Sequence, residues 1–255
     1  RAGSLRGDIT DPDAWDSILE QGPPSVDHVV LCVAPARSRG DSHASTYPAA
    51  ARGEVRLAHL LSARTITYTS STGVYGVTDG SLVTEDSEIA CSDDRCRALL
   101  EAEEAVLHQS AEHEMRRIVL RVAGLYGPGR DPAARLRQTP LREDEDGRWR
   151  NFAWRDDVTA AVLHLQDTRS EGVHPEAFNC ADGMPVLARD IRRWLHDDGS
   201  GATSNNIESG QRVSVDKLRE TGWSPLVTDV FQGLSMLGHV PASGLPCSAR
   251  APVSP

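Results

Sequence analysis

Hydroxyl side chains gather at one point of the sequence, in the run YTSSTGVYG at 68–76. The run continues an apolar, β-branched stretch that predicts a buried strand. Small hydroxyl residues at the end of such a strand lie at the carboxyl edge of a parallel sheet, where open α/β folds bind ligands. A hydroxyl there can donate to a developing oxyanion and share a proton. The alternative is a turn whose hydroxyls cap backbone groups, and the run alone does not decide between the two.

Three other side chains have a functional and a structural interpretation, and a fourth has a structural one. Tyr75 can donate a proton at the sheet edge, or it can pack the loop. The planar guanidinium of Arg130 can bind a phosphate or carboxylate, or form a surface ion pair. Trp154 can stack on a ligand, although core packing is favoured. Asp157 is expected to cap or support its helix.

The five cysteines, Cys32, Cys91, Cys96, Cys180 and Cys247, contain no CxxC pair. Their odd number leaves no tidy disulfide framework, which favours a reducing compartment. Cys91 and Cys96 also lack the usual spacing and partners of a metal site, so we expect no metal there.

Composition limits the classes of function. The 255 residues carry a net charge of −10 and are 39% hydrophobic, which is ordinary for a globular protein with one large core, or with one core and a small lobe. The acidic balance argues against nucleic acid as a partner, and no run reaches the roughly 20 apolar residues that span a bilayer. We expect a protein of the cytoplasm or of an organelle stroma or matrix. A targeting segment cannot be judged, because the sequence starts at Arg1.

The elements that position these residues follow from periodicity. Apolar, β-branched runs at 26–34, 65–69 and 118–122 are bounded by Pro, Gly or charged residues and predict buried parallel strands. Apolar residues repeat at helical spacing between them, at 51–61 and 92–112. Strand and helix in alternation imply right-handed crossovers and a parallel sheet.

The second half of the chain is less regular. The acidic run at 143–146 predicts a solvated loop. Further along we expect a helix at 156–166, a short strand around Phe178, a helix at 185–196 and a polar connection at 197–210.

Several motifs together resemble one family. The string SSTGVYG at 70–76 resembles the SSxxVYG segment of the extended short-chain dehydrogenases/reductases, the NAD-dependent epimerase/dehydratase group. Further matches follow in the family's order: GDITD at 7–11, LRVAGLYGPG at 120–129, RDDV at 155–158, and a closing pattern at 213–234 with Lys217, Gly222, Trp223 and Pro225. Each match is moderately specific, and their common order carries the resemblance.

The resemblance implies an α/β fold, a Rossmann-like doubly wound parallel sheet with a small C-terminal substrate-binding lobe. It implies an NAD(P)-binding domain over 1–130 and a mixed region over 131–240 that completes the sheet and the lobe. The composition of 241–255 predicts a disordered tail. The cofactor would be NAD or NADP, and the partner a small-molecule substrate. Dimerisation would use the helices near 51–61 and 92–112.

The resemblance also assigns roles to residues. Ser71 stands where the family has the hydroxyl that polarises the reacting group, and Tyr75 is the candidate substitute proton donor. The positions matched to cofactor binding are Asp8, Ile9, Ala34, Pro35 and Ser70. The positions matched to substrate binding are Thr72, Arg95, Gly124, Arg130 and Trp154. Thr72 and Gly73 stand where dehydratases have two acidic residues, so sugar dehydration is not expected.

Two family features are absent from the sequence. The YxxxK acid/base pair would fall on Arg95 and Leu99, and 92–113 contains neither Tyr nor Lys. No GxxGxxG turn, which lets the cofactor pyrophosphate approach a helix N-terminus, occurs anywhere. We expect truncation to explain the missing turn, with a strand–helix–strand unit of roughly 30 residues or more upstream.

Three hypotheses remain. The first is an NAD(P)-dependent oxidoreductase or epimerase of a small polar or sugar-like metabolite, with Ser71 orienting the reacting oxygen. The second is a non-catalytic dinucleotide-binding sensor or scaffold, suggested by Arg95 and Leu99. The third is a truncated product with an unprotected sheet edge that folds poorly.

Overall fold

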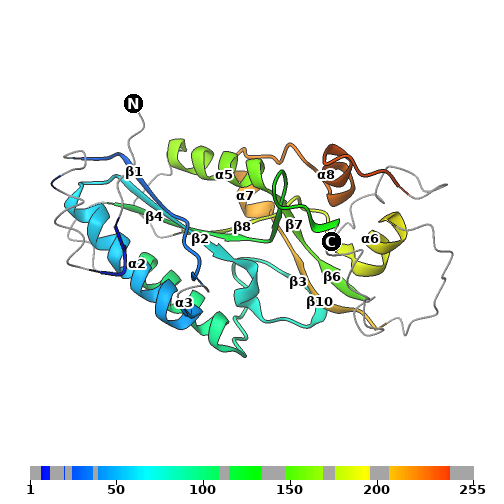
Figure 1. The fold of residues 1–255 in the computed structure, drawn as a ribbon, viewed down its shortest axis with the longest axis horizontal. Coiled ribbons are helices and arrows are strands. Elements are labelled where there is room, and N and C mark those ends of the chain that lie inside the picture. The colour runs from blue at the N-terminus through cyan, green and yellow to red at the C-terminus, as the bar shows by residue number, and fades with distance from the viewer. Residues whose placement is uncertain are drawn as a thin grey trace. The chain divides into compact units, whose positions relative to one another are not determined.

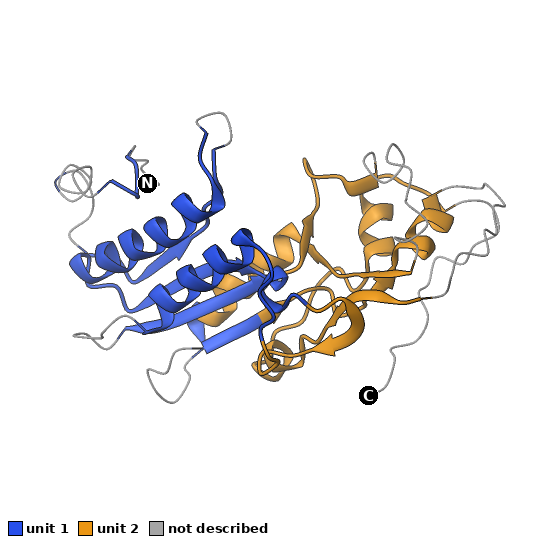
Figure 2. Cartoon of the chain, turned by 90° about the horizontal axis from the view of Figure 1, so that it is seen from below, with its two compact units in different colours: residues 1–76, 89–121, 166–178 blue, residues 77–88, 122–165, 179–255 orange. Residues whose placement is uncertain are grey.

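A computed structural model describes residues 7–11, 20, 25–36, 40–108, 115–133, 147–168, 176–195 and 207–241. The chain divides into two compact units whose segments alternate along the sequence (Figure 2). Unit 1 comprises Arg1–Gly76, Ile89–Arg121 and Gln166–Phe178, and unit 2 comprises Val77–Glu88, Val122–Leu165 and Asn179–Pro255. The predicted loop at 143–146 and the tail after residue 241 lie outside the described residues.

Unit 1 contains most of a four-stranded sheet with the order β1-β2-β4-β8 (Figure 1). Its strands are β1 (His28–Leu31), β2 (Thr65–Ser71), β4 (Arg116–Val122) and β8 (Glu176–Cys180). β1 and β2 are parallel, with Leu31 opposite Tyr68, so their carboxyl ends meet at the same edge. Ile66 and Ile118 are fully buried, as expected for strands covered on both faces. The predicted parallel sheet is confirmed.

Helices α2 (His43–Leu60) and α3 (Asp94–His108) pack against each other beside this sheet (Figure 2). α2 begins with a capping box, in which the Ser42 hydroxyl accepts from the Ser45 backbone N–H and the Ser45 hydroxyl accepts from that of Ser42. The helix predicted at 51–61 therefore starts earlier than its apolar period indicates. α3 lies within the predicted 92–112, of which 109–112 are not described.

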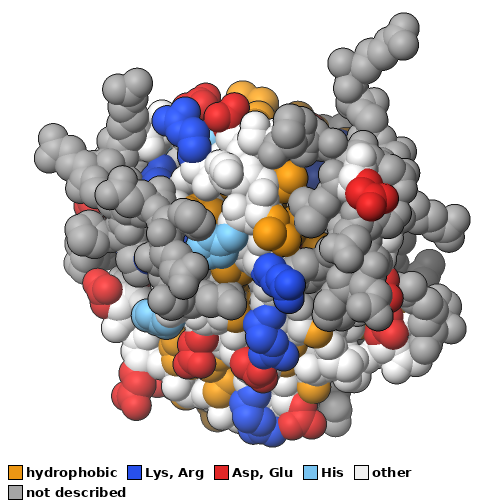
Figure 3. Space-filling model, turned by 90° about the vertical axis from the view of Figure 1, so that its left-hand side faces the viewer, with side chains coloured by type: hydrophobic (Ala, Val, Ile, Leu, Met, Phe, Trp, Pro, Cys, Tyr) orange, Lys and Arg blue, Asp and Glu red, His pale blue; other side chains and the backbone are white. Residues whose placement is uncertain are grey.

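The outer surfaces of α2 and α3 carry charges. Arg52 and Glu101 form an exposed ion pair of 2.8 Å between the two helices. On the face in Figure 3, basic side chains lie among acidic and hydrophobic ones. None of the helices in the described ranges is both long enough and apolar enough to cross a membrane.

Unit 2 contains a second sheet with the order β3-β10-β6-β9. Its strands are β3 (Asp79–Val83), β10 (Ser209–Val213), β6 (Arg148–Arg150) and β9 (Val186–Leu187). β10 is parallel to β3 and β6, and β9 is antiparallel to β6. The polar connection predicted at 197–210 thus ends before Ser209. The central strands carry Arg, Gln and Trp rather than an apolar run, so periodicity does not predict this sheet.

The described part of unit 2 also contains a parallel pair of strands and several helices. The strands are β5 (Gly124–Tyr126) and β7 (Phe152–Trp154). The helices are α5 (Arg155–Asp167), which ends in unit 1, α6 (Ala188–Leu195), α7 (Asp216–Glu220) and α8 (Val230–Met236). The helices predicted at 156–166 and 185–196 correspond to α5 and α6, except that β9 precedes α6.

The core of unit 2 combines aromatic and aliphatic side chains. Tyr126 packs edge-on against Phe152 and Trp154, with ring centroids 5.5 and 5.2 Å away. α8 meets this ring through Gly233, where a Cβ atom would lie 2.1 Å from the Tyr126 hydroxyl oxygen. Glycine at 233 is therefore what lets the helix approach the ring.

Gly233→Ala should destabilise the protein, although alanine is the better helix former. The helical gain of about 1 kcal/mol is outweighed by overpacking against a buried ring, which costs about 1–3 kcal/mol. We expect a lower midpoint in urea unfolding. Met236→Ala changes an exposed side chain of the same helix and should stay within about 0.5 kcal/mol of wild type. An equal effect of both substitutions would contradict the close contact.

Glu54 is a buried carboxyl group in the middle of α2. Glu54 is only 7% exposed. Burial disfavours the charged carboxylate and raises the pKa of this group to about 8, so the carboxyl keeps its proton. The folded chain therefore holds this proton at neutral pH, whereas the unfolded chain releases it near the ordinary value of 4.5. This difference in proton binding makes the free energy of unfolding highest below pH 4.5, where both states are protonated. The free energy of unfolding falls as the pH rises from there through about 8.

The free energy of unfolding should consequently fall between pH 5 and pH 9, as urea titrations at several pH values would show. Glu54→Gln removes the titration and should flatten this profile, with a gain on the order of 4 kcal/mol at pH 9. Glu101→Gln, on the exposed face of α3, should keep the wild-type slope. A Glu54→Gln profile as steep as that of wild type would contradict the assignment.

Candidate active site

The turn with the predicted catalytic hydroxyl lies at the carboxyl end of β2. Ser71 is the last residue of β2 and the N-cap of a 3₁₀ turn, η2 (Thr72–Tyr75). Its Oγ accepts a hydrogen bond from the Gly73 backbone N–H at 3.2 Å. The hydroxyl thus does cap the backbone, and it does so as an acceptor, which leaves its own proton for another partner. Ser71 is half-buried, whereas Thr72 is buried.

Gly76 ends this turn in the left-handed region, with φ of 64°. A Cβ atom there would lie 1.9 Å from the Ala90 carbonyl oxygen, and the Ala90 N–H donates to the Tyr75 carbonyl at 3.0 Å. Only glycine combines this backbone angle with this approach. The segment that leads into α3 therefore rests directly on the turn.

Tyr75 points into unit 1 and is fully buried. Its hydroxyl accepts a hydrogen bond from Arg121 Nη1 at 3.1 Å, and the guanidinium carbon lies 5.1 Å from the ring centroid. The packing interpretation of Tyr75 describes this position. Direct proton donation remains a prediction.

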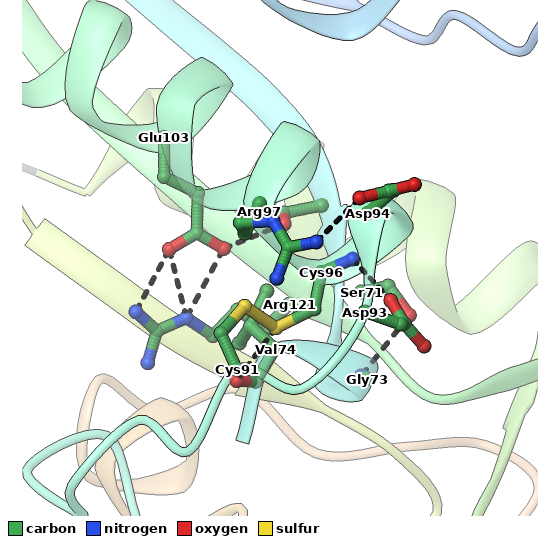
Figure 4. The surroundings of a disulfide bond; sticks show 11 residues. Ser71, Gly73, Val74, Cys91, Asp93, Asp94, Cys96, Arg97, Glu103 and Arg121 are labelled. Atoms are coloured by element: carbon green, nitrogen blue, oxygen red, sulfur yellow. Dashed lines mark hydrogen bonds and ion pairs between the residues drawn. A yellow bond between two sulfur atoms is a disulfide. The ribbon is translucent and has the colours of Figure 1, made fainter. Parts of the chain in front are cut away.

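A buried ion pair holds the turn from inside. Arg121 of β4 and Glu103 of α3 meet at 2.8 Å, with side chains 6% and 3% exposed (Figure 4). Ser70 Oγ donates to the same carboxylate at 2.5 Å. Burial alone would lower the pKa of Arg121, but the Glu103 carboxylate outweighs it and raises the pKa, so the guanidinium stays charged. Sequence reasoning missed this network, because Glu103 is one of several acidic residues in the predicted helix and its spacing does not single it out.

Several predicted cofactor residues lie near the same sheet edge. Ala34 and Pro35 follow β1, whose carboxyl end adjoins that of β2. Thr69 Oγ1 donates to the Leu31 carbonyl at 3.0 Å and ties the two strand ends together. Ser70 is on β2 but turns its hydroxyl inward to Glu103.

The other predicted residues of unit 1 are more exposed. Asp8 accepts hydrogen bonds from the backbone and hydroxyl of Thr10, forming a local turn that also contains Ile9. Arg95 is exposed in the first turn of α3, and Leu99, one turn later, is buried in the core. The two positions matched to YxxxK thus hold a surface cation and a core side chain.

Cys91 and Cys96 form a disulfide between the segment preceding α3 and its first turn (Figure 4). The expectation of no disulfide framework is wrong for this pair. The spacing is not CxxC, but the helical turn brings the two Cα atoms within 5.5 Å. Closing so short a loop is worth about 2 kcal/mol in a chain-entropy treatment. Cys32 and Cys180 are free thiols, exposed and buried respectively.

The substrate residues predicted in unit 2 lie around β5 and β7. Gly124 opens β5, and a Cβ there would lie 2.9 Å from the Asn151 carbonyl oxygen. Arg130 is exposed, and its Nε donates to the Leu125 carbonyl at 2.9 Å. Trp154 is 4% exposed, in the core beside Tyr126, as the favoured interpretation has it.

Two buried carboxyl groups shape unit 2. Asp157 accepts from the backbone N–H groups of Leu226 and Val227 at 2.8 and 2.9 Å. From the first turn of α5, it therefore anchors the segment before α8. Asp182 is 2% exposed and accepts from the Met184 N–H, and burial raises its pKa. Within the described ranges, no cluster of His, Cys, Asp and Glu could hold a metal ion.

Glu103→Gln should lower the free energy of unfolding by about 3 kcal/mol, because it leaves the Arg121 charge buried without its counter-ion. Glu101 lies two residues before Glu103 and is the exposed partner of Arg52. Glu101→Gln should therefore lower the free energy of unfolding by less than about 1 kcal/mol. Urea unfolding of the two variants compares them directly. Similar losses would mean that the buried pair does not anchor the turn.

The comparisons with known proteins place the chain. The model of the NAD dependent epimerase/dehydratase family matches residues 3–181. A putative NAD-dependent epimerase/dehydratase from Methylobacillus flagellatus is similar at 28% identity and a TM-score of 0.75, over 91% of this chain and 82% of its own. A search of curated proteins finds no significant match.

Two solved structures with bound ligands share the fold. MoeE5, in complex with UDP-glucuronic acid and NAD, is 19% identical with a TM-score of 0.66, over 91% of this chain and 82% of its own. RMD from Pseudomonas aeruginosa, complexed with NADPH, is 21% identical with a TM-score of 0.68, over 90% of this chain and 85% of its own. The Rossmann-like fold is thereby confirmed, and the chain belongs to the NAD dependent epimerase/dehydratase family.

Proposed function

We propose that the protein is an NAD(P)-dependent oxidoreductase or epimerase that acts on a small polar or sugar-like metabolite. The observation that carries this is the Ser71 hydroxyl, held at the carboxyl end of β2 by its own acceptor bond from Gly73. That bond fixes the oxygen and leaves its proton free to be donated to a substrate oxygen. Such a pre-oriented donor stabilises charge as it develops on the reacting group.

The nicotinamide nucleotide would lie along the edge where β1 and β2 end. The parallel pairing of these strands brings Ala34 and Pro35 to the same edge as Ser71, which fits a dinucleotide lying across strand ends. No GxxGxxG string occurs in the sequence to receive the pyrophosphate. When bound, the cofactor supplies hydride transfer. Asp8 and Ile9 remain proposed contacts for its adenine part.

The substrate contacts proposed from the motifs are Thr72 and Arg95 in unit 1, and Gly124, Arg130 and Trp154 in unit 2. Of these, Arg130 and Arg95 are the exposed cations, and a guanidinium fork suits a phosphate or carboxylate group. MoeE5, a similar structure, binds UDP-glucuronic acid, which carries both kinds of group. We propose an anionic metabolite on this basis.

Tyr75 has a different part in this proposal. Its enclosed hydroxyl, which accepts from Arg121, keeps the turn in place beneath Ser71. Direct proton transfer by Tyr75 would require its hydroxyl to turn away from Arg121 and reach the substrate.

A non-catalytic dinucleotide-binding module is the second candidate. It is favoured by Arg95, an exposed side chain, and Leu99, a core side chain, at the two positions where family members have an acid/base tyrosine and its lysine. A sensor of this kind would bind the cofactor without turnover.

Calorimetric titration with NADH and NADPH, on the protein expressed from its complete reading frame, tests the shared part of both candidates. We expect binding of at least one nucleotide. No binding of either would end the proposal.

Turnover on a panel of nucleotide sugars and other anionic metabolites separates the two candidates. Ser71→Ala should lower kcat by about 10²–10³ with cofactor binding unchanged, because only the oxyanion donor is lost. Ser81→Ala, which removes an exposed hydroxyl on β3, should leave kcat unchanged. Cofactor binding without turnover on any substrate would favour the sensor.

A further inference from the structure

The Cys91–Cys96 disulfide closes a short loop beside the Ser71 turn (Figure 4). Cys91 is half-exposed, whereas Cys96 is buried in the first turn of α3. The residues between them, 92–95, are all exposed. A thiolate can therefore reach the bond from the Cys91 side, while Cys96 stays enclosed.

This loop touches the turn at two points. Cys96 Sγ lies 3.3 Å from the Val74 carbonyl oxygen. On the other side of the loop, the Ala90 N–H donates to the Tyr75 carbonyl, and the Ala90 carbonyl packs on Gly76. The Cys96 contact belongs to the ring that the disulfide closes, and Ala90 immediately precedes that ring at Cys91. With the disulfide closed, Ala90 and the first turn of α3 are therefore linked across a short distance and hold η2 together.

The oxidation state of Cys91 and Cys96 affects both contacts between the loop and the turn. A disulfide sulfur has no hydrogen, so the approach of Cys96 to Val74 is a packing contact when the bond is closed. A dithiol reductant would transfer two electrons and two protons, so that the Cys91–Cys96 bond breaks, two S–H groups form and the reductant itself becomes a disulfide. The Cys96 thiol could then donate to the Val74 carbonyl, while Cys91 would be released and Ala90 would lose its tether.

The interior anchor of the turn is independent of this bond. Ser70, Glu103, Arg121 and Tyr75 are joined by hydrogen bonds that involve neither cysteine. Reduction should therefore loosen the outer side of the turn without unfolding unit 1. Such a local change in order, in a fold that persists, is what a reversible switch requires.

We propose that Cys91 and Cys96 form a reversible thiol–disulfide site, reduced by dithiols, that sets how firmly the turn from Ser71 to Gly76 is held. The evidence for the thiol–disulfide site is the set of contacts that the 91–96 loop makes with the turn. Its control of turnover rests on the proposed function of Ser71.

Hydrogen exchange measured by mass spectrometry, on the air-oxidised and the dithiothreitol-reduced protein, tests this directly. We expect exchange about tenfold faster after reduction in peptides that cover 71–76 and 89–96, with the Ala90 amide as the most direct reporter. Peptides from β4 and from the core of unit 2 should not change. The melting temperature should fall by about 5 °C and recover on reoxidation.

Variants separate this bond from the other thiols. Cys91→Ser should exchange like the reduced protein, with or without dithiothreitol. Cys32→Ser removes an exposed thiol of the same unit and should respond like wild type. Alkylation with peptide mapping should label Cys91 and Cys96 only after reduction.

Three results would overturn the proposal: labelling of Cys91 and Cys96 in the air-oxidised protein, unchanged exchange at 71–76 after reduction, or a response to dithiothreitol that survives in Cys91→Ser. A change in exchange without a change in turnover would overturn the control of activity. If no nicotinamide nucleotide binds, the proposed function falls, and the exchange result still decides on the thiol–disulfide site.

Discussion

The buried pair of Glu103 and Arg121 is the interaction on which the candidate site depends. It joins α3 to β4, and it reaches β2 and η2 through Ser70 and Tyr75. An ion pair removed from water is a poor source of net stability, since desolvation offsets much of the attraction. Its geometric effect is stronger, because a misplaced partner would leave a bare charge in the core. The pair thus restricts unit 1 to arrangements in which the hydroxyl turn is held against the sheet.

The fold of unit 1 could be predicted because its strands and helices carry a strong apolar period. The runs at 65–69 and 118–122 are almost wholly apolar or β-branched, so burial on both faces can be inferred from residue type. β10 and β6 could not be predicted. β10 is Ser-Gly-Gln-Arg-Val and β6 is Arg-Trp-Arg, so neither carries an apolar run. The pairing of β10 with β3 also joins segments far apart in sequence. Such pairing leaves no local signal.

The candidate site divides in the same way. Ser71 and its turn could be predicted, because a strand that ends in hydroxyl residues and glycine is a recognisable local pattern. The same segment also resembles a motif of the family. The partners of that turn could not, because Glu103 and Arg121 meet only when the sheet has formed. Nor could the disulfide be predicted, since a spacing of five residues does not bring two cysteines together until Cys96 is known to lie in the first turn of a helix. In each case the residue types are common ones, and the sequence does not show that they lie close together in the folded protein.

The alternation of the two units along the chain has a consequence for synthesis. Unit 1 takes its last segment, Gln166–Phe178, from beyond the first long stretch of unit 2, and that segment supplies much of the edge strand β8. While the chain emerges from the ribosome, one edge of β4 therefore has no partner strand until the residues of β8 have been made. During that interval the growing chain exposes an apolar strand edge, the kind of surface that chaperones cover. The order in which the units alternate thus makes the nascent protein more dependent on its cellular surroundings than either finished unit would be.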